Sequence, residues 1–174
     1  MKINFFFFII FFFYSITSNS INIKVVDMQI IIDNSESLKS LYNLVENDQK
    51  QFLNNFKNEE ASLEIKLSEI NELKMILNAQ ELDKEIDIYN ELLNNFNYRV
   101  EKFNIHYDNQ INIHKNIIIN KIVDLLKEYS LENNVDLILD ANNYILSNNS
   151  INITDFITTK LNEIIIESNF EKYK

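Results

Sequence analysis

The sequence predicts a mostly helical α+β protein in which a long antiparallel helical hairpin projects from a small β-body. Three observations support this fold class. A heptad pattern of apolar residues runs through more than half of the 174 residues. The stretch that carries it contains no glycine or proline, the two residues that most disfavour a helix interior. Short β-branched segments lie on both sides of it, at residues 21–29 and 135–140.

The first twenty residues have the features of a secretory signal peptide. Lys2 is followed by an apolar run over residues 5–14, which is shorter than the ~20 residues that a membrane-spanning helix needs. Ser18 and Ser20 supply the small residues that favour cleavage after Ser20, and an uncleaved anchor is the alternative. Cleavage would remove Lys2 and no acid, so the formal charge would change from −10 to −11. We therefore predict an exported protein.

Residues 21–29 predict the first strand, and the first arm of the hairpin follows it. Asp33, Asn34 and Ser35 supply side-chain oxygens of the kind that cap a helix start. The apolar seam of this arm consists of Leu38, Leu41, Val45, Phe52, Phe56, Leu63, Leu67, Ile70 and Leu77. Phe52 and Leu63 are eleven residues apart, a spacing that a helix accommodates by a local change of supercoil.

The second arm has the more regular seam, and the hairpin tip before it is predicted at residues 78–81. Asn78 and Glu81 have the spacing of a capping box there. Two apolar columns with seven-residue steps follow, Ile86, Leu93, Val100 and Tyr107 in one and Tyr89, Phe96, Phe103 and Ile117 in the other. Each arm is expected to be about 65–75 Å long at 1.5 Å per residue.

This second seam becomes polar toward its end. Gln110 interrupts the second column, and His114 and Lys121 continue the first. The arm runs to about Glu132, where Asn133 and Asn134 follow, and asparagine tolerates the left-handed conformation that commonly ends a helix.

The remaining residues predict the rest of the β-body. Residues 135–140 predict a second strand and residues 143–147 a short third one. A last helix is predicted to start with a cap at Thr154 and Asp155, and its apolar positions are Ile157, Leu161, Ile164 and Ile165. The polar tail 167–174 is expected to fray. Strands that flank a hairpin must meet at its base, and so small a sheet has free edges that another subunit could pair with.

The two ends of this pattern resemble the periplasmic chaperones of the Skp or OmpH-like family. The resemblance rests on residues 23–29 with Ser35 and Lys39, on residues 135–141, and on residues 151–155 with Leu161 and Asn162. With the helical segment between them, it covers nearly all of the mature chain. Asn134 stands where the family usually has glycine, and Glu36 and Asn149 stand at usual proline positions, but each replacement is locally tolerable.

This resemblance implies a homotrimer in the periplasm. Strands of three subunits would form a β-body, and three hairpins would surround a cavity that holds unfolded outer-membrane β-barrel proteins without ATP. The domain division would be a signal peptide at 1–20, a trimerisation body at 21–34 and 132–174, and a helical tentacle at 35–131. The residues expected in the trimer body are Ile23, Val25, Val26, Val135, Leu137, Leu139 and Ile153.

Six aromatic residues on or near the hairpin seam are the candidates for client contact. They are Phe52, Phe56, Tyr89, Phe96, Phe103 and Tyr107. Packing of one arm against the other is the alternative role for the same side chains. Many weak apolar contacts without fixed register suit a holding chaperone, because its clients share no sequence.

Composition disfavours several other functions. The acidic charge argues against nucleic acid and anionic lipid as partners, so we do not carry over the lipopolysaccharide binding linked to this otherwise basic family. The absence of cysteine excludes disulfides and thiol nucleophiles. His106 and His114 are eight residues apart, a spacing unsuited to a shared metal, and we expect His106 to be solvated. Asp136 and Asp140 are expected on a solvated side of their strand rather than as a catalytic pair.

The sequence thus predicts no catalytic, cofactor-binding or metal-binding residues, and no enzyme activity. The favoured function is an ATP-independent periplasmic holding chaperone for unfolded outer-membrane proteins. The alternative is a structural or adaptor coiled coil of the cell envelope without chaperone activity, since both functions use the same periodicity.

Overall fold

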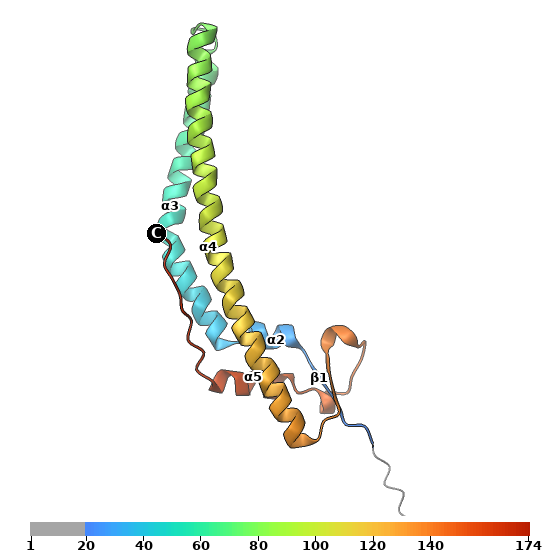
Figure 1. Cartoon of the computed structure of the whole chain (residues 1–174). Helices are drawn as coiled ribbons and strands as arrows, with labels where there is room; N and C mark the ends of the chain where they lie inside the picture. The colour runs from blue at the N-terminus through green and yellow to red at the C-terminus, as the bar shows by residue number, and fades with distance from the viewer. Residues whose placement is uncertain (1–19) are drawn as a thin grey trace, which may run out of the picture.

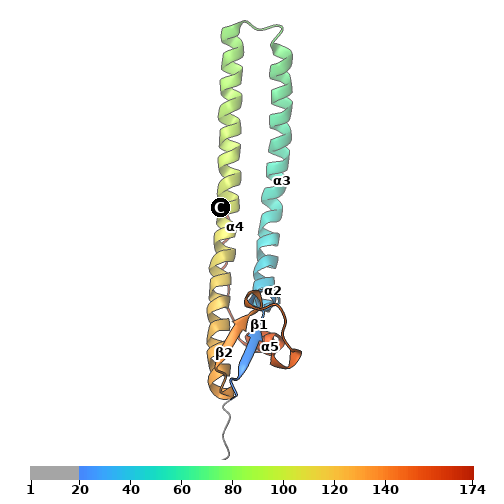
Figure 2. The same cartoon turned by 90° about the vertical axis from the view of Figure 1, so that its right-hand side faces the viewer.

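A computed structural model describes residues 20–174, so all but the last residue of the predicted signal peptide lies outside the described residues. Two long helices lie side by side and join at one end, and the short elements gather around the other end, which we call the base (Figures 1 and 2). The fold class predicted from the sequence is confirmed. The elements are, in order, β1 (Ile23–Val26), α2 (Met28–Asp33), α3 (Glu36–Leu73), α4 (Ala79–Asn133), β2 (Leu137–Asp140), η1 (Ala141–Asn143), η2 (Asn149–Ile151) and α5 (Thr154–Glu163).

The predicted caps at the start of α3 and at both ends of α4 are confirmed, whereas the hairpin tip is the link 74–78 between α3 and α4 rather than residues 78–81. Ser35 caps α3, and its side chain accepts a hydrogen bond from the Leu38 amide. Asn78 and Glu81 form both hydrogen bonds of a capping box at the start of α4. Asn134 ends α4 in the left-handed conformation, with φ 49° and ψ 50°.

The two arms are not of equal length, contrary to our estimate. Helix α3 has 38 residues and α4 has 55, which correspond to about 57 and 83 Å at 1.5 Å per residue. The difference arises because α4 continues past the start of α3 and down to the base (Figure 2). Within residues 20–174, no helix is both long and apolar enough to cross a membrane.

The first strand is shorter than predicted, and a helix that the sequence pattern did not indicate follows it. Residues 28–29 belong to α2, which starts where the Asp27 side chain accepts a hydrogen bond from the Ile30 amide at 2.9 Å. Helical geometry in this β-branched run buries Ile31 and Ile32 in the core. Tertiary burial therefore overrides the local preference for a strand.

The sheet has two strands among the described residues. Strand β1 pairs in parallel with β2, in register from Ile23 opposite Leu137 to Val26 opposite Asp140, as expected for strands that flank a hairpin. The third strand predicted at residues 143–147 is wrong. The Asp140 side chain accepts a hydrogen bond from the Asn142 amide and turns the chain into η1.

The hydrophobic core joins the base to the lower part of the hairpin. Its buried members come from β1, α2, α3, α4 and α5, with Ile153 before α5. Helix α5 lacks the predicted side-chain cap, because the Thr154 hydroxyl accepts a hydrogen bond from the Asp27 amide instead, at 2.9 Å. Ile157 and Leu161 of α5 are buried as expected, whereas Ile164 and Ile165 lie beyond the end of the helix.

The seam of α4 changes register near the base. The buried residues are Phe103, Tyr107, His114, Ile118 and Ile122, so the predicted Ile117 and Lys121 are not seam residues. The steps from Phe103 to His114 and from Tyr107 to Ile118 are both eleven residues, a spacing that keeps buried positions aligned on a straighter helix. In α3 the predicted seam residue Leu67 is likewise exposed.

Candidate functional site

The segment 164–174, which we call the tail, is docked on the hairpin rather than frayed, which corrects our prediction for residues 167–174. It leaves α5 and runs along the two long helices to a point beside the middle of α3 (Figure 1). Ser37 Oγ donates to the carbonyl of Ile166 at 2.9 Å. The Tyr173 amide donates to Asp48 Oδ2 at 3.0 Å. The tail is therefore bound to α3 at both of its ends.

The tail has the alternating burial of an extended chain. From residue 164 to 171 the even positions are partly buried and the odd positions are exposed. The partly buried side chains are Ile164, Ile166, Ser168 and Phe170, and the exposed ones are Ile165, Glu167, Asn169 and Glu171. One face of the tail thus packs on the hairpin and the other faces solvent.

Phe103 is the centre of a cluster of aromatic rings contributed by α3, α4 and the tail. Its ring centroid lies 5.0 Å from Tyr107, 5.2 Å from Phe56, 5.3 Å from Tyr173 and 5.9 Å from Phe52. Three of these four contacts are edge-to-face, the favoured geometry for aromatic pairs. We call Phe52, Phe56, Phe103, Tyr107 and Tyr173 the aromatic cluster.

The six predicted client-contact residues differ in exposure. Phe103 and Tyr107 are 2% and 1% exposed, so in this conformation they pack arm to arm and offer no surface. The other four, Phe52, Phe56, Tyr89 and Phe96, are partly buried. Phe96 contacts the cluster through Phe56, with ring centroids 6.0 Å apart.

A buried carboxylate, Asp48, lies between the arms and was missed by our sequence reasoning. It is 7% exposed and accepts the Tyr107 hydroxyl at 2.7 Å as well as the Tyr173 amide. The signal was present in the sequence, because Asp48 falls between Val45 and Phe52 at a seam position of the heptad pattern. Burial, and then the hydrogen bond to Asp48, raises the pKa of Tyr107 well above its ordinary value, so the hydroxyl stays protonated and donates.

Gln110, which interrupts the predicted seam, binds the tail backbone. Its Oε1 accepts from the Glu171 amide at 2.7 Å, and its Nε2 donates to the Glu171 carbonyl at 2.8 Å. His106 also contacts this carbonyl, at 2.8 Å, and its ring packs edge-on against Tyr107 and Tyr173. His106 is therefore partly buried by the tail rather than freely solvated as predicted.

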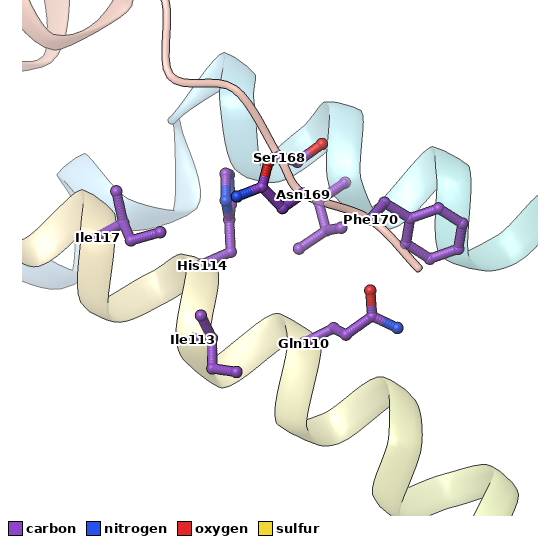
Figure 3. Close-up of a pocket in the computed structure, with 8 residues that line it drawn as sticks. Gln110, Ile113, His114, Ile117, Ser168, Asn169 and Phe170 are labelled. Carbon is purple, nitrogen blue, oxygen red and sulfur yellow. The ribbon is translucent and has the colours of Figure 1, made fainter. Parts of the chain in front are cut away.

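His114 is 3% exposed and lies where the tail passes the base of α3. Ser37 donates its one hydroxyl proton to the Ile166 carbonyl. In the 2.6 Å contact between Ser37 Oγ and His114 Nε2, the protonated Nε2 therefore donates and the hydroxyl oxygen accepts. Burial lowers the pKa of His114 below its ordinary value of 6.5. His114 also borders a cavity of about 80 Å³ between the tail and the arms, whose lining includes Gln110 and Phe170 (Figure 3).

Most of the predicted trimer-body residues are covered within the single chain. Val25, Val26, Val135 and Ile153 are buried, Ile23 and Leu139 are partly buried, and Leu137 is 45% exposed. Among the most exposed apolar side chains are Ile145 and Leu146 on the loop after η1, which are fully or almost fully exposed.

The two strand-end carboxylates have structural roles. Asp136 Oδ2 accepts the Asn22 amide at 2.7 Å, and Asp140 Oδ1 accepts the Met28 amide at 3.0 Å. The Met28 amide, followed by the hydrogen bonds from residues 141 and 142, lowers the pKa of Asp140. Asp136 is exposed as expected, whereas Asp140 is partly buried. Across residues 20–174, no group of three or more potential ligands has metal-binding geometry.

Comparison with known proteins gives one family and one fold. The family model described as outer membrane protein (OmpH-like) matches residues 22–161. The structure is similar to the crystal structure of a Caulobacter crescentus protein described as a candidate outer membrane chaperone (OmpH-like), with a TM-score of 0.67 and 12% sequence identity over 89% of this chain and 92% of that chain. No curated protein matches the sequence. At this identity the structural likeness establishes the fold alone, and residues 162–174 lie beyond the family match.

Proposed function

The chain belongs to the OmpH-like family, and from this premise we propose that it is an ATP-independent holding chaperone for unfolded outer-membrane β-barrel proteins in the periplasm. The family match supports a chaperone-type role, and this match is the observation that carries the proposal. To this role the proposal adds the class of client, the periplasmic compartment and the independence from ATP.

The surface of the hairpin supports a role in holding clients. Apolar side chains are exposed along both arms beyond the core, and they include Leu53, Ile65, Leu67, Ile88, Leu92, Tyr98 and Ile105. Each would contribute a weak contact, about 1 kcal/mol or less, so that affinity comes from the sum of many. Such a surface accepts clients of unrelated sequence and releases them without an energy source.

We also propose that three copies associate through the base, with residues 21–34 and 132–174 as the trimerisation domain and 35–131 as the tentacle. A two-stranded sheet is rarely stable alone, and the outer edge of β2 carries the exposed Leu137. The exposed Ile145 and Leu146, on the loop after η1, are further apolar side chains available for such an interface. The mass of the native assembly tests this proposal, and a monomer or dimer would favour the adaptor alternative.

The chaperone proposal is tested by aggregation of a β-barrel client. Purified mature protein is mixed at about one trimer per client while an unfolded outer-membrane protein is diluted out of urea, and light scattering is followed without nucleotide. We expect scattering to be suppressed. Loss of protection across several clients would support the adaptor coiled coil instead.

A matched pair of variants tests which surface is responsible. Ile88→Ser with Leu92→Ser removes two exposed apolar side chains of α4, and Asp87→Ser with Glu91→Ser changes their exposed acidic neighbours. We expect the first pair to weaken protection and the second to leave it unchanged. Equal behaviour of the two pairs would exclude apolar contact with this part of the hairpin.

A further inference from the structure

We propose that the groove between α3 and α4 that holds the tail is a binding site for an extended client segment, and that the tail is an intramolecular competitor for it. When a client segment with alternating apolar side chains enters this groove, the tail leaves. This inference rests on the proposed chaperone function and adds to it a defined site, a class of ligand and a regulatory segment.

Most of the polar contacts in the groove are to the backbone of its occupant, apart from the Tyr173 hydroxyl, which donates to the Arg99 carbonyl at 3.4 Å. Ser37 binds the Ile166 carbonyl, Gln110 binds the amide and carbonyl of Glu171, and Asp48 binds the Tyr173 amide. Main-chain amides and carbonyls are present in almost every residue of any protein. Recognition of an extended chain through its backbone, with pockets for alternate side chains, is an established mode of peptide binding. The same polar side chains therefore suit other extended segments.

The apolar contacts in the groove select for an alternating segment that carries an aromatic residue. Ile164, Ile166, Ser168 and Phe170 are partly buried, while Ile165, Glu167 and Asn169 between them are exposed. The Tyr173 ring then packs edge-on against Phe52 at 5.2 Å and Phe103 at 5.3 Å. Strands of membrane β-barrels alternate apolar and polar residues and have aromatic residues near their ends. The tail thus has the chemistry of the clients that the chaperone proposal names.

The tail is held loosely enough to be displaced. It lies outside helices and strands, and at least half of its side chains are exposed. The cavity of about 80 Å³ beside Ser168, Asn169 and Phe170 shows that its packing is incomplete (Figure 3). Segments with few buried contacts open at low free-energy cost.

Displacement is measured with a spin label in the full mature chain. The protein contains no cysteine, so Lys174→Cys gives a unique attachment point next to the docked Tyr173. We expect the nitroxide spectrum to show restricted motion in the free protein and fast motion after a urea-diluted β-barrel client binds. A label at the exposed Asn95→Cys on α4 controls for general loosening and should not become more mobile. A tail label that stays restricted in the client complex would overturn the inference.

Competition is measured with paired tail variants. Phe170→Ala with Tyr173→Ala weakens docking of the tail, and we expect client affinity to rise about tenfold because the groove is then more often empty. Glu167→Ala with Lys172→Ala changes two exposed tail residues and should leave affinity within about twofold. Unchanged or weaker client binding by the first pair would mean that the tail does not compete for the groove.

The two proposals fail in distinguishable ways. If neither the wild-type protein nor the tail variants suppress client aggregation, the chaperone function fails and this inference fails with it. If aggregation is suppressed but the Lys174→Cys label stays restricted, only the competition for the groove is wrong.

Discussion

Replacing Phe103 with alanine should be among the most destabilising single changes in the hairpin. The ring is 2% exposed and contacts four other aromatic rings, two from α3, one from α4 and one from the tail. Its removal takes away the burial of a large apolar side chain and leaves a cavity. The cavity cannot collapse fully, because the tip and the base hold α3 and α4 at a fixed separation.

The expected loss is about 4 kcal/mol of unfolding free energy. Fully burying a phenylalanine is worth about 1.5–3 kcal/mol, and the residual cavity brings the usual cost of such a truncation to about 3–5 kcal/mol. Phe96→Ala is the matched control on the same helix, because Phe96 is only partly buried and pairs with one ring, that of Phe56. We expect it to lose about 1–2 kcal/mol.

Urea denaturation followed by far-ultraviolet circular dichroism measures both losses. Protomer concentration must be equal in all samples, because assembly adds to apparent stability. With a slope of about 2 kcal/mol per molar urea, Phe103→Ala should lower the midpoint by about 2 M. Equal shifts for the two variants, or a loss below about 1 kcal/mol for Phe103→Ala, would refute the central position that we assign to this ring.

Three further predictions concern polar residues. Tyr107→Phe should cost about 1–3 kcal/mol because the buried Asp48 loses its hydroxyl donor; an unchanged urea midpoint would argue against this contact. Burial holds the pKa of His114 below 6.5 in the folded protein, so the unfolded chain takes up a proton first as the pH falls. The free energy of unfolding should therefore decrease below about pH 6.5. His114→Gln should reduce the difference between the unfolding free energies measured by urea denaturation at pH 7 and at pH 5. Asn134→Gly should be tolerated at φ 49°, whereas Asn134→Val should lower thermal stability by about 1–2 kcal/mol, and equal melting temperatures would contradict this.

Local features of the sequence were sufficient to predict the structures that depend only on residues close together in the chain. The capping box of Asn78 and Glu81, the cap at Ser35 and the left-handed Asn134 each depend on residues within a few positions of one another. The pairing of strands on either side of the hairpin followed from connectivity alone. In the site, the aromatic residues of the seam were found because heptad spacing marks them.

Local features failed where a contact joins distant residues. A β-branched run became α2 because Ile31 and Ile32 are buried in a core shared with α3, α4 and α5. The seam of α4 shifted to Ile118 and Ile122 because the base packs against that side of the helix. Asp48 was visible as a polar seam residue, but its partners were not.

The sequence by itself determined that this chain makes a capped helical hairpin with strands at its base, since backbone hydrogen bonds in a helix join residues four apart and caps act over one turn. Only the tertiary structure decided that the polar tail docks in the groove between the arms. The bonds that hold it join Gln110 to Glu171 and Asp48 to Tyr173, 61 and 125 residues apart. No periodicity in the sequence predicts such long-range pairs, because they form only after folding has placed the polar seam residues Asp48 and Gln110 beside the tail.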